Sequence, residues 1–218
     1  MSDFILANEP TIRILGFVSV LGVMAVWEIL ATRRPQTIKR RVRWPGNLAI
    51  VILDTLAVRL LFPLAAVGAA IYASEQGWGL LNLVSMSGWV AVMLAVLALD
   101  LAIYFQHRIF HAVPWLWRLH RMHHADLEFD VTTGLRFHPL EILLSMAIKM
   151  AVVVLIGAPA LAVVVFEVLL NATSLFNHGN VRLPQRVDRW LRLLLVTPDM
   201  HRVHHSAIQR ETDSNFGF

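Results

Sequence analysis

Residues 142–176, ILLSMAIKMAVVVLIGAPALAVVVFEVLLNATSLF, decide the fold of this chain. They form one long apolar stretch with a single interruption, the Gly-Ala-Pro sequence at residues 157–159. Glycine and proline close together mark a turn. The stretch therefore predicts a helical hairpin. Since each half is short for a full membrane span, we expect both halves to enter and leave the membrane on one side.

Two charged residues interrupt this apolar hairpin. Lys149 and Glu167 lie at equal separations from Ala158, so the two arms would hold them at similar depth. An ion pair would lower the cost of burying either charge. A snorkelling Lys149 and an interfacial Glu167 explain the pattern equally well.

The composition is that of a polytopic membrane protein. Of the 218 residues, 57% are hydrophobic and 16% are charged, whereas soluble domains are about half apolar and a quarter charged. The absence of cysteine excludes disulfides, thiolate metal ligands, iron–sulfur clusters and cysteine nucleophiles. The net charge of +4 comes almost wholly from arginine. In a membrane protein this charge serves headgroup contacts and orientation, so we expect no nucleic-acid partner.

Three further apolar stretches, at residues 14–31, 48–73 and 89–105, precede the hairpin. We therefore predict an all-α integral membrane bundle with three to five transmembrane or re-entrant helices. The loop 33–43 is rich in basic residues and the loop 74–87 has none. The positive-inside rule places the first loop in the cytoplasm, and the third stretch then returns to the cytoplasm.

The ten histidines begin at His107 and are grouped. Eight of them form three boxes: His107 and His111; His120, His123 and His124; His201, His204 and His205. On a helix, positions i, i+3 and i+4 share one face about 5–6 Å apart. Imidazole suits zinc, copper, iron and nickel. Eight ligands exceed the needs of one ion, so the boxes predict two metals in a histidine-rich helical cap on the cytoplasmic side.

Two single histidines and one carboxylate stand near the boxes. His178 follows the hairpin at the depth where the boxes meet, so we expect it to be a metal ligand. His138, which precedes a proline, would be either a ligand or a residue that supports one. Asp100 lies seven residues before His107, on nearly the same helical face. It would either fix the tautomer of a ligand histidine or line the bundle interior.

These motifs resemble the fatty acid hydroxylase superfamily, also called the sterol desaturase family, of membrane-bound non-haem di-iron oxygenases. The segments that carry the resemblance are DLAIYFQHR (100–108), LWRLHRMHH (116–124), LRFHPLE (135–141) and TPDMHRVHH (197–205). The resemblance implies that the eight box histidines, with His178 added, bind two iron ions. It also implies a transmembrane anchor at residues 1–94 and a catalytic region at residues 95–218 that is short at its C-terminus relative to the family.

The resemblance further implies that the protein hydroxylates or desaturates an unactivated C–H bond of a lipid, such as a sterol or fatty acyl chain, with dioxygen. The chain has no dinucleotide fingerprint or cysteine cluster, so an external electron donor, either a reductase or a small carrier, is expected. The arginines near the boxes would attract an acidic carrier or contact lipid phosphates. The choice of iron over zinc rests on the resemblance.

Two other classes of protein remain alternatives. A zinc-dependent membrane hydrolase needs a carboxylate beside a metal-bound water, and here Glu128 and Glu141 lie outside the boxes. A metal transporter would hold its histidines within the spans at the bilayer midplane, whereas these lie at and beyond span ends.

Overall fold

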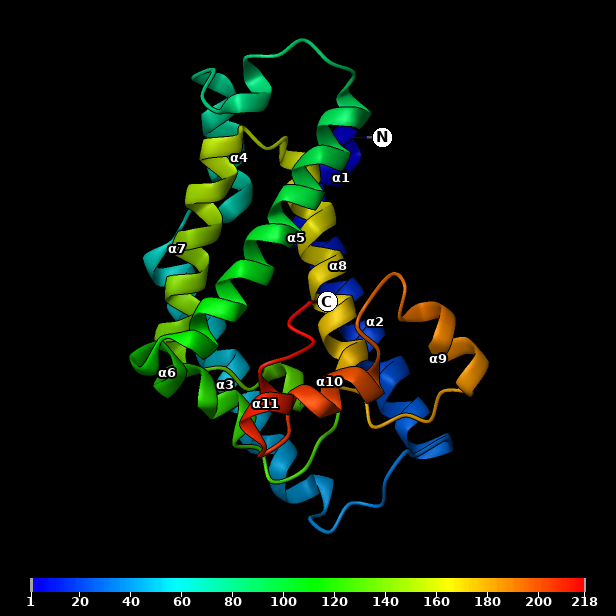
Figure 1. Ribbon diagram of the computed structural model, residues 1–218. Helices are drawn as coiled ribbons and strands as arrows, with labels where there is room; N and C mark the ends of the chain where they lie inside the picture. The colour runs from blue at the N-terminus through cyan, green and yellow to red at the C-terminus, as the bar shows by residue number, and fades with distance from the viewer. Residues whose placement is uncertain (1, 218) are drawn as a thin grey trace.

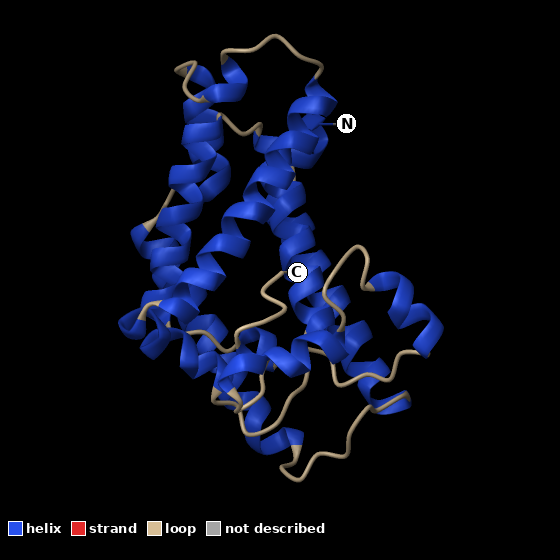
Figure 2. Ribbon diagram, in the orientation of Figure 1, coloured by secondary structure: helices blue, strands red, loops and turns tan. Residues whose placement is uncertain are grey.

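The computed structural model describes residues 2–217, and within that range the chain is helical, with one isolated β-bridge between Thr32 and Val181 (Figures 1 and 2). Five helical segments are long and apolar enough to cross a membrane. They are α2 (Glu9–Leu30), α3 (Arg40–Leu61) continued by α4 (Ala65–Glu75), α5 (Gly88–Ala112), α7 (Pro139–Ile156) and α8 (Ala160–Asn177). The predicted all-α membrane bundle is confirmed.

The remaining helices are short. They are α1 (Ser2–Ala7), α6 (Pro114–His124), α9 (Gln185–Leu191), α10 (Pro198–His204), α11 (Gln209–Thr212) and the 3-10 turns η1 (Leu80–Asn82) and η2 (Thr133–Leu135). Figure 1 shows that α6, α9, α10 and α11 gather at one end of the bundle, where α5 and α8 finish.

The second apolar stretch is not one uninterrupted helix. The predicted segment 48–73 is broken between Leu61 and Ala65, because Pro63 has no N–H to donate and its ring clashes with the preceding turn. The helix also begins earlier than its apolar stretch, at Arg40, so its first turns carry the basic side chains of Arg40, Arg41 and Arg43.

The hairpin predicted around residues 157–159 is present. Gly157 ends α7 in the left-handed conformation with φ at +67°, which favours glycine. A Cβ atom there would lie 2.9 Å from the carbonyl oxygen of Trp78, so the close approach of the 77–79 loop requires glycine as well. Each arm has 18 residues, about 27 Å of helix, which is close to the thickness of the hydrocarbon core.

The charges inside the hairpin pair with each other, as one of the two interpretations predicted. Lys149 Nζ lies 2.5 Å from Glu167 Oε1. A second cation, Arg13 of α2, lies 3.1 Å from Glu167 Oε2. The carboxylate is almost fully buried, and two cations from different helices lie against it, of which Arg13 also pairs with Glu9 at 3.1 Å.

The outside of the bundle is apolar. Leu60, Leu97 and Leu155 expose 81%, 65% and 69% of their surface, which suits lipid better than water. Small and branched side chains such as Val153 and Val163 fill the interior between α4, α5, α7 and α8. This is a helical membrane protein.

Buried polar groups tie the N-terminal helices to the histidine-bearing end. Glu28 of α2 is fully buried; its Oε1 accepts from the amides of Val131 and Asn180 at 2.7 and 2.8 Å, and its Oε2 pairs with Arg40 at 3.0 Å. One carboxylate thereby holds the loop after α6 against the segment after α8.

A second polar junction lies on α3. Arg43 pairs with Asp126 at 2.6 Å and with Asp130 at 2.7 Å, and all three side chains are buried. Asn47 also donates to Asp126 and to Thr132. The segment predicted as an anchor therefore also fixes the loop 125–133, and a division of the chain at residue 94 stays a prediction.

Candidate metal centre

Nine of the ten histidines converge into two adjoining groups of candidate metal ligands. We name the first cluster A: His107, His111, His120, His124 and His204. We name the second cluster B: His123, His178, His201 and His205. Within each cluster one nitrogen atom of every ring lies within 4.8 Å of the others.

The helical spacing of the boxes explains how the ligands divide. His107 and His111 project from the last turns of α5 into cluster A. The second box lies on α6 and the third on α10, and each contributes to both clusters. The clusters touch where the His124 ring stacks on that of His205, with centroids 4.3 Å apart. The two short helices thus contribute to both sites, while α5 adds ligands to cluster A and His178, at the end of α8, adds one to cluster B.

Outer hydrogen bonds set the tautomers of several rings. The Nδ1 atoms of His107, His178 and His204 lie 2.9, 2.7 and 2.7 Å from the carbonyl oxygens of Phe216, Ser174 and Ser214. A carbonyl only accepts, so each Nδ1 carries the proton and each Nε2 presents a lone pair. This is the arrangement of a metal-binding imidazole whose orientation is fixed from outside.

The inner nitrogens of the two clusters face each other at short distances. His107 Nε2 lies 3.0 Å from His120 Nε2, and His178 Nε2 lies 3.0 Å from the Nε2 atoms of both His123 and His201. Two nitrogens bound at right angles to a metal at about 2.1 Å would be separated by about 3 Å. The Nε2 atoms of His111, His124, His204 and His205 are buried without a hydrogen-bond partner among the described residues. These donor sets fit metal ions.

Burial keeps these imidazoles neutral, the form that binds a metal. Desolvation lowers the pKa of His178 to about 3 and that of His204 to about 4. Desolvation, together with the neighbouring rings, also lowers the pKa of His123 and His201 well below its usual value. Nine adjacent cations at neutral pH would repel one another, so the lowered values are physically consistent.

Some supporting residues were not predicted from the sequence. Glu141 Oε1 lies 2.6 Å from His120 Nδ1, the outer nitrogen of that ligand. Phe137 stacks on His123 with centroids 4.4 Å apart and an interplanar angle of 8°. Both residues belong to the segment 135–141 that carries the family resemblance, but their spacing from the boxes indicates no contact. Phe216, whose ring packs against His107 and His204, gave no signal at all.

Two predicted site residues lie elsewhere. His138 belongs to neither cluster; its Nδ1 caps α7 by accepting from the amide of Leu140 at 3.1 Å. Asp100 is exposed on α5, so it does not line the bundle interior. The tautomer of His107 is set by the carbonyl of Phe216 instead.

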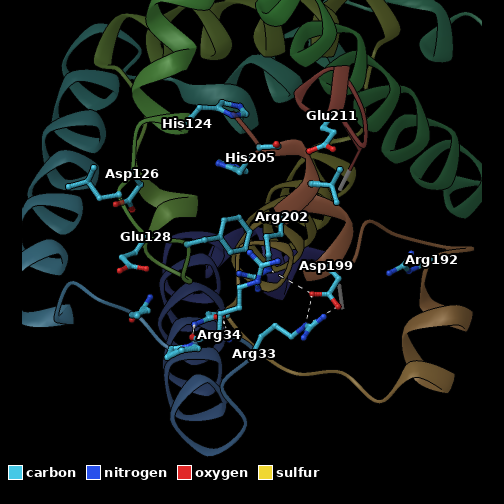
Figure 3. A pocket seen from close by; sticks show the side chains of 17 residues that line it. Arg33, Arg34, His124, Asp126, Glu128, Arg192, Asp199, Arg202, His205 and Glu211 are labelled. Atoms are coloured by element: carbon cyan, nitrogen blue, oxygen red, sulfur yellow. Dashed lines mark hydrogen bonds and ion pairs between the residues drawn. The ribbon is translucent and has the colours of Figure 1, made fainter. Parts of the chain in front are cut away.

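A polar cavity of about 680 Å³ opens beside the clusters (Figure 3). His124 and His205 lie on one side of it, and Arg33, Arg34, Arg202 and Asp199 lie on the other. The cavity lies at the end of the bundle that carries the short helices, so one side of the metal centre faces away from the apolar spans.

A helical membrane bundle with two adjoining all-imidazole clusters at one end defines a class: membrane proteins with histidine clusters able to bind metal ions. The sequence profile of the fatty acid hydroxylase family matches residues 92–218, more than half of the chain. The chain belongs to this family, as the motifs predicted.

Curated relatives agree with this assignment. The ornithine lipid hydroxylase OlsE of Rhizobium tropici is 30% identical over 126 residues, which cover 58% of this chain and 37% of the relative. The alkylglycerol monooxygenase of Homo sapiens is 28% identical over 146 residues, 65% of this chain and 30% of the relative. The Xenopus tropicalis alkylglycerol monooxygenase is 29% identical over 127 residues, 56% of this chain and 26% of the relative. The matched regions thus span about a third of these relatives or less. No solved structure matches the chain.

Proposed function

We propose that the protein is an O₂-dependent oxidoreductase of membrane lipids that uses two iron ions, one in each histidine cluster. The observation that carries the proposal is the convergence of nine histidines into two adjoining clusters, in which inner Nε2 atoms lie 3.0 Å apart. Family membership and two relatives named as a lipid hydroxylase and an alkylglycerol monooxygenase support it.

Two bound iron ions would supply the activation of dioxygen. In hydroxylation a C–H bond breaks, a C–O bond forms and the second oxygen atom leaves as water, which consumes two electrons and two protons. In desaturation two C–H bonds break and both oxygen atoms leave as water, with the same two electrons and two protons. An external reductase or small electron carrier must provide the electrons.

The chain's own part is to position and shield. Outer hydrogen bonds from His107, His120 and His204 hold three rings of cluster A in place, which preorganises the ligands. The phenyl ring of Phe216 covers cluster A with centroids 5.0 Å from His111 and 5.4 Å from His204. That ring excludes water from one side of the site.

We also propose that the clusters face the cytoplasm. The basic segment 33–43 lies at the same end of the bundle as the histidines, and Arg33 and Arg34 line the cavity beside them. Basic loops remain on the cytoplasmic side of a membrane.

The zinc hydrolase alternative finds no support in the position of Glu141. This carboxylate binds the outer nitrogen of His120, away from the inner nitrogens that would hold a metal. It therefore orients a ligand and is not placed as the base for a metal-bound water.

The test is metal analysis combined with isotope labelling. The protein would be purified from membranes, assayed for iron and zinc, and reduced under ¹⁸O₂ with membrane lipid extract. We expect about two irons per chain and a lipid product labelled with ¹⁸O, or, if the reaction is desaturation, a product that has lost two hydrogens. One zinc per chain, or no oxidised lipid from an iron-loaded and reduced protein, overturns the proposal.

A further inference from the structure

The polar cavity beside the clusters contains an arginine whose charge is incompletely balanced. Arg202 of α10 exposes only 11% of its side chain. Its Nε and Nη2 atoms are buried and have no hydrogen-bond partner among residues 2–217. Its nearest carboxylate oxygen, Asp199 Oδ1, is 3.8 Å from Nε, beyond hydrogen-bond reach. Such a group is uncommon, because buried polar atoms almost always have a hydrogen-bond partner.

Three of the four carboxylates around the cavity are engaged with other partners. Asp199 accepts from Arg33 Nε at 3.0 and 3.1 Å. Asp126 pairs with Arg43 at 2.6 Å, and Glu128 accepts from the amides of Thr37 and Ile38 at 2.6 and 2.9 Å. Glu211 lines the cavity from α11, the short helix that follows the third box.

Within the described chain, Arg202 therefore lacks a hydrogen-bonded carboxylate, although the cavity lining as a whole holds four arginines and four carboxylates. Arg34 lines the same cavity, and its charge acts on Arg202 together with that of Arg33. Burial lowers the pKa of Arg202 to about 10, which leaves the side chain a cation at physiological pH. Guanidinium groups without an internal counter-ion are suited to planar or tetrahedral oxyanions.

The cavity also lies next to the metal centre. The Arg202 guanidinium sits 4.6 Å from the ring centroid of Phe129, and that ring lies 5.2 Å from the ring of His205. One phenyl group thus separates the guanidinium from cluster B, and His205 itself lines the cavity.

We propose that this cavity binds the anionic group, a carboxylate or a phosphate, of the lipid substrate, with Arg202 and Arg34 as the residues that hold it. The proposal rests on the lipid oxidation proposed above and adds that the attacked carbon lies near the charged end of the lipid. A long apolar tail would extend toward the membrane, because the cavity walls are charged.

The test measures anion binding by the full chain in nanodiscs of neutral phosphatidylcholine, with inorganic phosphate as the probe in isothermal titration calorimetry. We expect saturable binding of one phosphate, weakened about tenfold or more by Arg202→Gln and by Arg34→Gln. Arg186→Gln is the matched control, because Arg186 is an exposed arginine on α9 that does not line the cavity. The control is expected to bind like the wild type.

A second arm distinguishes a lipid headgroup from a free anion. In nanodiscs that contain phosphatidylglycerol, lipid headgroups that enter the cavity would compete with phosphate and reduce its apparent affinity. If the apparent affinity for phosphate is the same with and without the anionic lipid, the proposal that the cavity binds a lipid headgroup is overturned. The absence of phosphate binding overturns the anion site. Phosphate binding that Arg202→Gln leaves intact also overturns it, because the phosphate would then be bound elsewhere, for example at the metals.

This readout is separate from catalysis. Phosphate binding that depends on Arg202 and Arg34 in a protein that oxidises no lipid would leave the anion site standing while the proposed function fails. If the protein oxidises lipid but binds phosphate equally well after Arg202 and Arg34 are replaced, the proposed function stands and the anion site fails.

Discussion

Clusters A and B use the same kind of ligand but hold it in different ways. In cluster A the outer nitrogens of His107, His120 and His204 have hydrogen-bond partners, one of them the carboxylate of Glu141. In cluster B the Nδ1 atoms of His123 and His201 are buried with no partner among the described residues.

In the described chain, cluster B has one such hydrogen bond, from His178 Nδ1 to the carbonyl oxygen of Ser174, and aromatic packing against other rings. Phe137 stacks on His123, and the Phe129 ring lies 5.8 Å from that of His178. Phe129 belongs to the loop that Arg43 and Asp130 fix. Hydrogen bonds orient a ring and raise its basicity, whereas packing orients it only. We therefore expect cluster A to bind its metal more tightly and cluster B to depend more on the surrounding fold.

The largest effects should come from loss of a ligand. His204→Ala removes a cluster A ligand and His201→Ala a cluster B ligand. Each variant should retain about one metal of two and lose activity by at least about a hundredfold, because an incomplete ligand set binds weakly. Elemental analysis and product yield measure both.

The matched control for these two variants is His138→Asn. It changes a histidine outside both clusters and keeps a side chain that can cap α7. Retention of both metals by His204→Ala would contradict the assignment of cluster A.

The next largest effect should come from the loop beside cluster B. Arg43→Gln leaves two buried carboxylates without their cation and should lower the free energy of unfolding by about 3–5 kcal/mol. Metal loss from cluster B should exceed that from cluster A. Thermal unfolding and metal content measure this, with the exposed Arg186→Gln as control, and equal loss from both clusters would show that the loop does not favour cluster B.

The pH dependence of this variant gives a second measurement. Burial raises the pKa of Asp130, but hydrogen bonds from Thr132 and Gln36 and the charge of Arg43 outweigh it, and the pKa is lowered. A lowered carboxyl pKa stabilises the fold above the unfolded value of about 3.9, and the contribution is lost as the pH falls through the folded value. The stability difference between wild type and Arg43→Gln should therefore shrink below about pH 4.

A smaller effect is expected from the carboxylate that supports cluster A. Glu141→Gln keeps an oxygen near His120 but removes its charge, so metal affinity at cluster A should fall about 10- to 100-fold. Cluster B should keep its metal. Competition with a chelator measures the two affinities, and Glu75→Gln, at an exposed glutamate, is the control. A fall in metal affinity confined to cluster B would contradict the assignment of Glu141 to cluster A.

The smallest effect should come from the aromatic support. Phe137→Leu removes the stacking on His123, worth about 0.5–1.5 kcal/mol, and should weaken metal binding at cluster B by less than about tenfold. Phe216→Leu makes the equivalent change against the rings of cluster A. The same chelator titration should show each variant acting on its own cluster, and a shared effect would mean that the rings support both.

The sequence predicted the parts of this molecule that follow a period. Apolar stretches indicated the spans, residues 157–159 indicated the hairpin turn, and helical spacing placed His120 and His124 on one face. The division of each three-histidine box between two sites could not be predicted, because it depends on how α6 and α10 face each other. Glu141 and Phe216 reach the site only through the tertiary fold.

The triad of Arg13, Lys149 and Glu167 has a consequence for how the protein is made. The chain is synthesised from its N-terminus, so both cations leave the ribosome before the carboxylate. Glu167 therefore arrives last, when α2 and α7 can already offer it partners, and never has to cross the hydrocarbon layer as a solitary charge. The order of the charges along the chain lets the last span bring its carboxylate to helices that already carry both cations.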